Sequence, residues 1–196
     1  GDAWRVHATG VVQDVDGAED AGWAALAEVQ ARCNTHSAGV AQDGADDAST
    51  ALHLGPSFRW TVDTWANAAQ SETLALLRRP AAIDDTLAPH PGLLDSCFHL
   101  FDRFEPVHSP GEVFVPFAVS RCRFATDATL DEVWCRGVVR PVGEAGRVVG
   151  DLYLYAADGR PIAELLGFEL RRVPLDGLLQ RHAVDEWLYS VEWEPA

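Results

Sequence analysis

The sequence predicts an α+β fold in which an antiparallel sheet wraps around one central helix. The first observation is a segment from 90 to 101 that would be apolar almost all round as a helix, which is typical of a buried helix. The second is a series of four strand-like segments after it, of which the last two flank Ala157-Asp158-Gly159. Asp-Gly is a strong hairpin signal. One apolar helix and several antiparallel strands form a common core when the sheet covers the helix.

Residues 4–12 are predicted to form a strand, and an acidic stretch rich in alanine and glycine runs from 13 to 51. Within that stretch, apolar residues recur at the spacing of a short amphipathic helix. These residues are Trp23, Leu26, Val29 and Cys33. Residues 38–50 are predicted to be a loop, because small and polar residues dominate there.

A Gly-Pro turn at Gly55-Pro56 begins the next part of the chain. Two strand-like runs follow it, one with apolar residues at Trp60, Val62 and Trp65, the other with Leu74, Leu76 and Leu77. The helix is expected from Pro91 to about Phe101, since proline suits the first turn of a helix.

Four strands are expected after the helix, at residues 113–124, 132–141, 148–155 and 161–173. Pro116 interrupts the first of them, and the tail after residue 173 is expected to hold a short helix near Leu178. A single helix wrapped by five or six antiparallel strands is the hot-dog fold, and we predict it for this chain.

Composition limits the functions that are open to the chain. Its 196 residues fit one domain, and its formal net charge of -15 argues against nucleic acid and anionic membranes as partners. No apolar run is long enough to span a bilayer. The cysteines have no metal-ligand spacing, so we expect no metal site, and we expect buried free thiols in a reducing cytoplasm. They are Cys33, Cys97, Cys122 and Cys135.

Asp95 and His99 are the polar residues of interest on the apolar helix. They are four residues apart, and helical residues at that spacing lie on one face with Cβ atoms about 5–6 Å apart. A carboxylate inside a core needs a partner, so the pair indicates either a functional site or a polar pair near the helix surface. The spacing alone favours neither interpretation.

Several motifs resemble those of a known family, and they occur in the family's order. The segments are Trp4-Arg5-Val6-His7-Ala8-Thr9-Gly10, Leu54-Gly55-Pro56-Ser57-Phe58-Arg59, His90-Pro91-Gly92-Leu93-Leu94-Asp95, Val115-Pro116-Phe117 and Leu188-Tyr189-Ser190-Val191-Glu192-Trp193. They resemble the dehydratase domain of modular type I polyketide synthases. That family has the double hot-dog fold, so the resemblance implies that this chain is one half of such a domain, together with the end of the other.

The resemblance implies four regions. Residues 1–12 would be the last strand of the N-terminal hot-dog, 13–51 an acidic linker between the hot-dogs, 52–175 the C-terminal hot-dog, and 176–196 a linker toward a ketoreductase region. In such domains a histidine removes the α-proton of a β-hydroxyacyl thioester, and an aspartate protonates the departing hydroxyl. Asp95 would be that acid and His99 would orient it. Apolar surroundings favour the protonated form that an acid needs.

Further roles also rest on the resemblance. The substrate tunnel would be lined by Leu54, Gly55, Pro56, Phe58, His90, Pro91 and Phe117. The carrier protein would dock on the arginines Arg78, Arg79, Arg171 and Arg172, since arginine suits phosphate and carboxylate groups; solvated surface positions are the alternative interpretation. No cofactor is implied, because the substrate arrives on the phosphopantetheine arm of an acyl carrier protein. The first hot-dog half, a ketoreductase region and a second copy in a homodimer would be further partners.

The chain departs from the family pattern in two places. None of its seven histidines lies in the family's His-x-x-x-Gly-x-x-x-x-Pro motif, so we predict that these residues alone do not dehydrate a substrate. Leu54 stands where the family often has tyrosine. The alternatives to plain dehydration are a related double-bond isomerase, a pyran-forming cyclase, or a non-catalytic half that docks the carrier protein. Retention of Asp95 favours dehydration over isomerisation.

Overall fold

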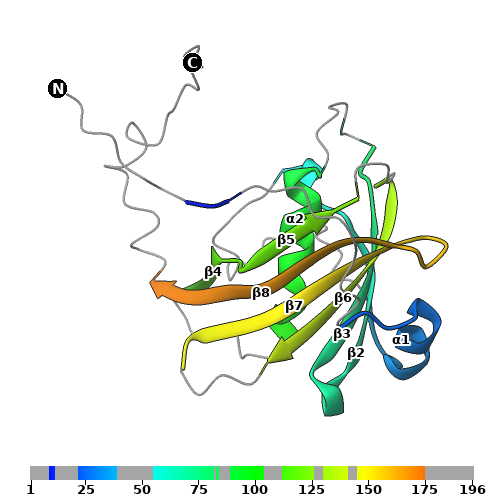
Figure 1. The fold of residues 1–196 in the computed structure, drawn as a ribbon, viewed down its shortest axis with the longest axis horizontal. Helices are drawn as coiled ribbons and strands as arrows, with labels where there is room; N and C mark the ends of the chain where they lie inside the picture. The colour runs from blue at the N-terminus through cyan, green and yellow to red at the C-terminus, as the bar shows by residue number, and fades with distance from the viewer. Residues whose placement is uncertain are drawn as a thin grey trace.

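An eight-stranded antiparallel sheet forms the body of the computed structural model (Figure 1). The structure describes residues 9–11, 22–38, 55–81, 83, 89–103, 112–125, 130–140 and 145–174. Residues 9–11 have no regular secondary structure. The loop was expected at 38–50, but Ala38 is the last residue of strand β1. Residues 39–50 of that loop, the remainder of the predicted strand at 4–12, Leu54 and the helix expected near Leu178 lie outside the described residues.

The order of strands in the sheet is β1-β2-β3-β6-β7-β8-β4, and β5 also pairs with β8. Their bounds are β1 Thr35–Ala38, β2 Thr61–Asn67, β3 Glu72–Arg78, β4 Glu112–Ala118, β5 Arg121–Phe124, β6 Glu132–Arg140, β7 Arg147–Ala156 and β8 Pro161–Pro174. The hairpin predicted at Ala157-Asp158-Gly159 is confirmed between β7 and β8. There the Gly159 amide donates to the Ala156 carbonyl, and Asp158 Oδ1 accepts from the Arg160 amide.

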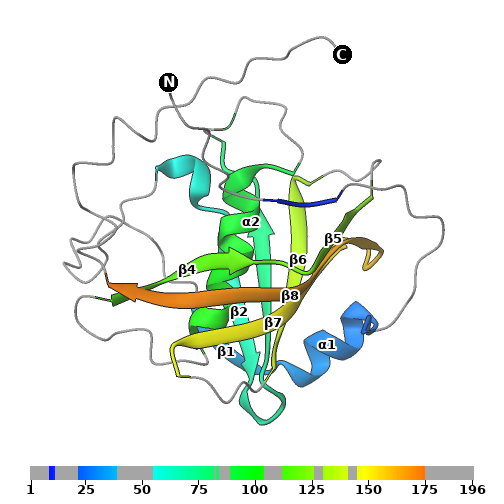
Figure 2. The same cartoon turned by 60° about the vertical axis from the view of Figure 1, so that its left-hand side comes forward.

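The predicted central helix is confirmed as α2, Pro91–Phe98, which the 3-10 helix η3, His99–Arg103, continues. The sheet curves around it, as Figures 1 and 2 show. Leu93, Cys97 and Phe101 from this segment are fully buried against side chains of β3, β6, β7 and β8. This is the predicted hot-dog architecture, with the helix in the concave face of an antiparallel sheet.

The opposite face of the sheet carries a second, smaller core. Successive residues of a strand point to opposite faces: Leu152 and Leu154 of β7 belong to the core around α2, whereas Tyr153 and Tyr155 belong to the other. Helix α1, Leu26–Arg32, covers this outer face, and it confirms the short helix predicted from the spacing of Trp23, Leu26, Val29 and Cys33. The segment 13–51 therefore contributes α1 and the edge strand β1 to the folded body.

The strand predicted at 113–124 is two strands, and the predicted break at Pro116 is wrong. Pro116 lies within β4, at the edge of the sheet beside a register shift, where a missing N–H is tolerated. The chain leaves the ladder at residues 119–120 instead, opposite Gly167, which has a φ of +60°. The Ser120 amide donates to the Leu166 carbonyl across this irregularity, so β4 and β5 follow one edge of β8 as two pieces.

Three of the four cysteines are buried and all four are free, as predicted. Cys122 is an exception to the predicted burial, since it is exposed. Its strand, β5, pairs only with β8 and lies at the sheet edge. Among the described residues, no helix has the length and apolar character needed to cross a membrane.

Candidate active site

The N-terminus of α2 is fixed by the residues that precede it. His90 is buried, and its Nδ1 accepts a hydrogen bond of 2.9 Å from the Gly92 amide, which satisfies one of the donors that a helix start leaves open. Pro91 occupies the first helical position, where its missing N–H costs nothing. The His90 ring also lies against Trp60, with ring centroids 5.7 Å apart.

The Gly-Pro turn, residues 55–58 with the 3-10 helix η1 at Pro56–Phe58, packs on this end of α2. Ser96 Oγ donates to the Phe58 carbonyl at 3.0 Å, and Trp60 Nε1 donates to the Ser57 carbonyl at 3.0 Å. A Cβ on Gly92 would lie 2.2 Å from the Ser57 oxygen. The turn therefore rests directly on the helix backbone, and only glycine leaves room for it.

One stripe of α2 joins this turn to the predicted acid. Gly92, Asp95, Ser96 and His99 follow the spacing i, i+3, i+4 and i+7, which places them on one side of a helix. Gly92 and Ser96 contact the turn, and Asp95 and His99 lie beside them on the same stripe. The turn thus contacts Ser96, the residue that follows Asp95 in the helix.

The Asp95 carboxyl group has an unusual environment. Its side chain is 30% exposed, yet its Oδ2 atom is buried and accepts no hydrogen bond from any residue that the structure describes. His99 Nε2 lies 3.4 Å from that oxygen, at an orientation that makes no hydrogen bond. The expected Asp95–His99 hydrogen bond is therefore absent, although the two groups are neighbours. A buried carboxyl oxygen without a donor is costly in a folded protein.

The structure brings together most of the residues predicted to line the tunnel. Gly55, Pro56, Phe58, His90 and Pro91 meet at the N-terminus of α2. Leu54 lies outside the described residues.

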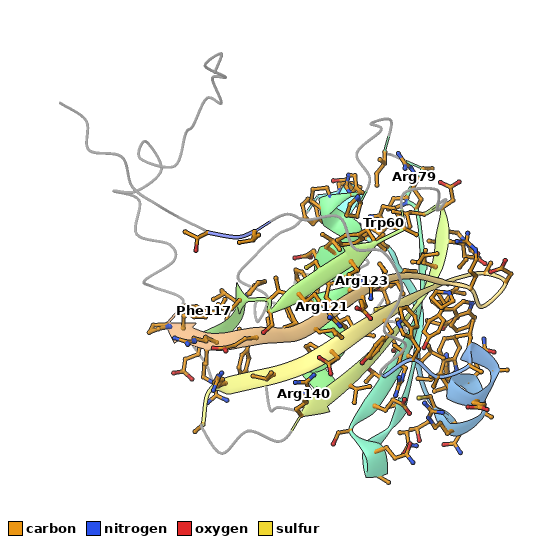
Figure 3. All side chains as sticks on the ribbon, in the orientation of Figure 1. Trp60, Arg79, Phe117, Arg121, Arg123 and Arg140 are labelled. Carbon is orange, nitrogen blue, oxygen red and sulfur yellow. The ribbon has the colours of Figure 1, made fainter. Side chains whose placement is uncertain are left out.

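Phe117 is not part of this group. It lies on β4, well apart from Trp60, as Figure 3 shows. Its side chain is 57% exposed, and the Arg171 guanidinium lies 3.4 Å from its ring centroid. Phe117 was expected in the tunnel only because Val115-Pro116-Phe117 resembles a family motif. In the structure its strand, β4, lies beyond β8 at the edge of the sheet.

The four predicted docking arginines do not form one patch. Arg78 lies on β3 and pairs with Glu132 of β6, and Arg79 follows it. Arg171 and Arg172 lie at the end of β8, and β6 and β7 separate β8 from β3 in the sheet. As neighbours in a strand, Arg171 and Arg172 also point to opposite faces. Arg171 pairs with Glu169, and Arg172 lies 3.8 Å from Glu112.

Two contributors to the site were missed in the sequence, namely Gly92 and Ser96. Both lie inside the motif that drew attention to Asp95, and their i, i+4 spacing shows that they share a helix face. Nothing in the sequence showed that this face would meet the Gly-Pro turn more than thirty residues upstream.

Solved structures with the same fold are dehydratase domains. The chain is similar to the dehydratase domain from the CurJ module of the curacin polyketide synthase, with 28% identity and a TM-score of 0.65 over 79% of this chain and 55% of that one. It also resembles in fold the dehydratase domain of a mycocerosic acid synthase-like polyketide synthase, with 21% identity and a TM-score of 0.63 over 81% and 56%.

A third similar structure is the bifunctional dehydratase-cyclase domain in ambruticin biosynthesis, with 24% identity and a TM-score of 0.54 over 63% of this chain and 44% of that one. The chain thus spans about half the length of these matched structures. No curated protein sequence matches it. Residues 24–180 match the family described as "Polyketide synthase dehydratase N-terminal domain". On the strength of that match, which covers most of the sequence, the chain belongs to the polyketide synthase dehydratase family.

Proposed function

We propose that the chain is the acid-bearing half of a dehydratase that removes water from a β-hydroxyacyl thioester on an acyl carrier protein. A base on the other half takes the α-proton, and the electron pair of that C–H bond forms the new double bond. The C–O bond at the β-carbon breaks, and the Asp95 carboxyl group gives its proton to the leaving hydroxyl. The products are water and an α,β-unsaturated thioester, and the proton taken by the base restores the acid form of Asp95 by way of solvent.

The environment of Asp95 carries this proposal. A general acid must hold a proton that it can deliver to the leaving group. In the described part of the chain no arginine pairs with Asp95, its buried Oδ2 has no hydrogen-bond donor, and His99 Nε2 lies 3.4 Å from that oxygen. The adjacent Gly-Pro turn supplies a fixed wall against which an acyl chain would lie.

We assign these residues to the second hot-dog half because the Asp95 helix resembles the acid-bearing motif of the family, although the family that matches is described as an N-terminal domain. The first half is then the source of the base. It would be the nearest partner of this chain, with a ketoreductase region beyond the tail and a second copy completing a homodimer.

No cofactor enters the proposed reaction. The carrier protein would deliver its phosphopantetheine-bound substrate, and of the arginines expected to meet it we favour those at the end of β8. Arg171 lies over the exposed ring of Phe117 there, which offers an acidic partner both a charge and an apolar contact. Arg78 and Arg171 each pair with a glutamate, Glu132 and Glu169, so the aromatic neighbour of Arg171 is what favours this end of the sheet.

The direct test is Asp95→Asn in the complete domain of which this chain is proposed to be the second half. The amide keeps the size of the side chain but has no acidic proton, so dehydration of a carrier-bound β-hydroxyacyl thioester should slow by about 10²–10⁴-fold. Mass spectrometry of the carrier-bound product would follow the loss of water.

Asp63→Asn is the matched control, because Asp63 is a partly exposed aspartate that pairs with His36 across β1 and β2 at the sheet edge. It should leave the rate unchanged. Turnover of Asp95→Asn at the rate of the unaltered domain would show that another group is the acid.

A further inference from the structure

Two contacts join the Gly-Pro turn to α2, those of Ser96 and Gly92, while Trp60 orders the turn itself and His90 orders the helix end. Ser96 and Trp60 each donate a hydrogen bond of 3.0 Å to a carbonyl of the turn. The missing side chain of Gly92 allows the turn to touch the helix backbone, and His90 caps the same helix end. The carbonyls of Ser57 and Phe58 are therefore both engaged, and the turn is held on the helix from two directions.

Ser96 is the residue that connects this arrangement to the acid. It follows Asp95 directly, and it is 3% exposed, so its hydroxyl has no access to bulk water as an alternative partner. The Phe58 carbonyl that it binds is partly buried, and a carbonyl shielded from water is destabilised when it loses its donor. Removing the hydroxyl would therefore free the Phe58 end of the turn from the residue that follows Asp95.

We propose that Ser96 is a positioning residue that determines acyl-chain specificity, by holding the Gly-Pro turn as a rigid wall beside Asp95. This inference rests on the proposed function, because the wall contacts a substrate only if Asp95 is the acid. Ser96 itself does not touch the reacting atoms. It acts through Phe58, and its loss loosens the wall without changing the acid.

Hydrogen exchange on this chain tests the positioning. The Phe58 and Arg59 amides donate to the Gly55 and Pro56 carbonyls within the turn. In Ser96→Ala they should exchange about 5-fold faster, the effect expected for losing one buried hydrogen bond. Ser120→Ala, an exposed serine on the sheet edge, is the control and should leave these two amides unchanged. Unchanged exchange at Phe58 and Arg59 in Ser96→Ala would overturn the proposal.

Gly92→Ala tests the same wall from the other direction. Its Cβ would lie 2.2 Å from the Ser57 oxygen, so the turn must move off the helix. Gly10→Ala is the matched control, since nothing lies within 4 Å of a Cβ placed there. The first variant should accelerate exchange of the Phe58 and Arg59 amides and the second should not.

Substrate preference in the complete domain tests specificity. From a panel of straight and α-methyl-branched β-hydroxyacyl carriers, the best and the worst substrates of the unaltered domain are compared. The ratio of their kcat/KM values should move at least about threefold toward one in Ser96→Ala, because a loosened wall discriminates less. Partial unfolding of the variant lowers both kcat/KM values by the same factor, so it leaves their ratio unchanged. The pH at which the rate falls as the acid is lost should also stay the same.

An unchanged ratio, or an unaltered domain that does not discriminate among the panel, would overturn the specificity role. Absence of dehydration by the unaltered domain would contradict the proposed function instead. In that case the exchange measurement still decides whether Ser96 positions the turn.

Discussion

At the scale of single residues, the buried carboxylates of this chain divide into two kinds. Glu72, Glu164, Glu169 and Asp151 are at most 7% exposed, and arginines contact each of them. Such partners keep a carboxylate ionised inside a protein. Asp95 differs from them: its side chain is 30% exposed, no arginine among the described residues contacts it, and His99 Nε2 lies 3.4 Å from its buried Oδ2. The first kind has a structural role, and the second kind suits a group that exchanges a proton.

Glu72 shows the structural role in detail. Arg32 of α1 donates two hydrogen bonds to its carboxylate, at 2.6 and 2.8 Å, and Arg136 of β6 donates a third. Burial by itself would raise the pKa of Glu72, but the hydrogen bonds from Arg32 and Arg136 outweigh burial and lower this pKa. Beside it, burial raises the pKa of the Cys33 thiol to about 11, with a further contribution from Glu72.

Glu72→Gln should destabilise the fold by about 2 kcal/mol at pH 7, because it leaves two partly buried arginines without a counter-charge. The folded-state pKa of Glu72 is below its unfolded value, so its stabilisation is present above pH ~4.3 and is lost as the pH falls through the lower folded pKa. The difference between the two proteins should therefore shrink in acid. Urea denaturation over a pH series measures it.

Glu132→Gln is the control for this comparison. Glu132 also pairs with an arginine, Arg78, but the two side chains are 38% and 58% exposed. Solvent screens such pairs, so the loss should stay below about 0.5 kcal/mol. Equal losses for the two variants would contradict a stabilising role for the buried network.

At the scale of elements, the β4–β5 edge depends on a local irregularity in β8. Gly167 takes a φ of +60°, and a Cβ there would lie 2.5 Å from Ser120 Oγ. The Gly167 amide donates to Asp151 Oδ1 at 2.8 Å. The irregularity lets one long strand pair with two short ones that do not form a continuous ladder.

Gly167→Ala should lower the free energy of unfolding by about 1–3 kcal/mol, of which roughly 1 kcal/mol comes from the left-handed backbone conformation and the remainder from the contact with Ser120. A double-mutant cycle with Ser120→Gly separates the two contributions. The double variant should be more stable than the sum of the single changes predicts, because the contact is then absent. Strict additivity would show that the Ser120 contact costs nothing.

At the scale of the whole molecule, the sheet has a separate core on each face. Helix α2 fills the concave face, while α1 covers part of the outer face (Figure 2). The polar stripe of α2 with Asp95 and His99 lies where the helix is not covered by the sheet, since these two side chains are 30% and 50% exposed. The chain spans about half the length of the dehydratase domains it matches, and this uncovered stripe is where a second half would complete a site.

The chain alone should not dehydrate a carrier-bound β-hydroxyacyl thioester, because none of its histidines lies in the family's base motif and removal of a weakly acidic α-proton needs a positioned base. Turnover should appear when a separately produced first half is added. The assay is mass spectrometry of the carrier-bound product, and the first half alone is its control. Full turnover by this chain alone would assign the base to one of its own histidines.

Most elements of the fold could be predicted from the sequence, because the patterns that indicate them lie within short stretches of neighbouring residues. The apolar periphery of α2, the Asp-Gly hairpin and the spacing of Trp23, Leu26, Val29 and Cys33 each predict an element from neighbouring residues. The break between β4 and β5 was misplaced, since it depends on Gly167 in a strand more than forty residues later.

Asp95 and the Gly-Pro turn were also identified from the sequence, as motifs of fixed spacing. Their relation in space was decided by the tertiary structure. Contacts between Ser96 and Phe58, and between Gly92 and Ser57, depend on the β2–β3 hairpin, which returns the chain to the turn before α2 begins. Phe117 is the opposite case. Its motif suggested a position in the site, but the structure places it on β4 at the sheet edge, beside Arg171. Sequence spacing determines what lies on one face of an element, whereas the packing of elements determines which faces meet.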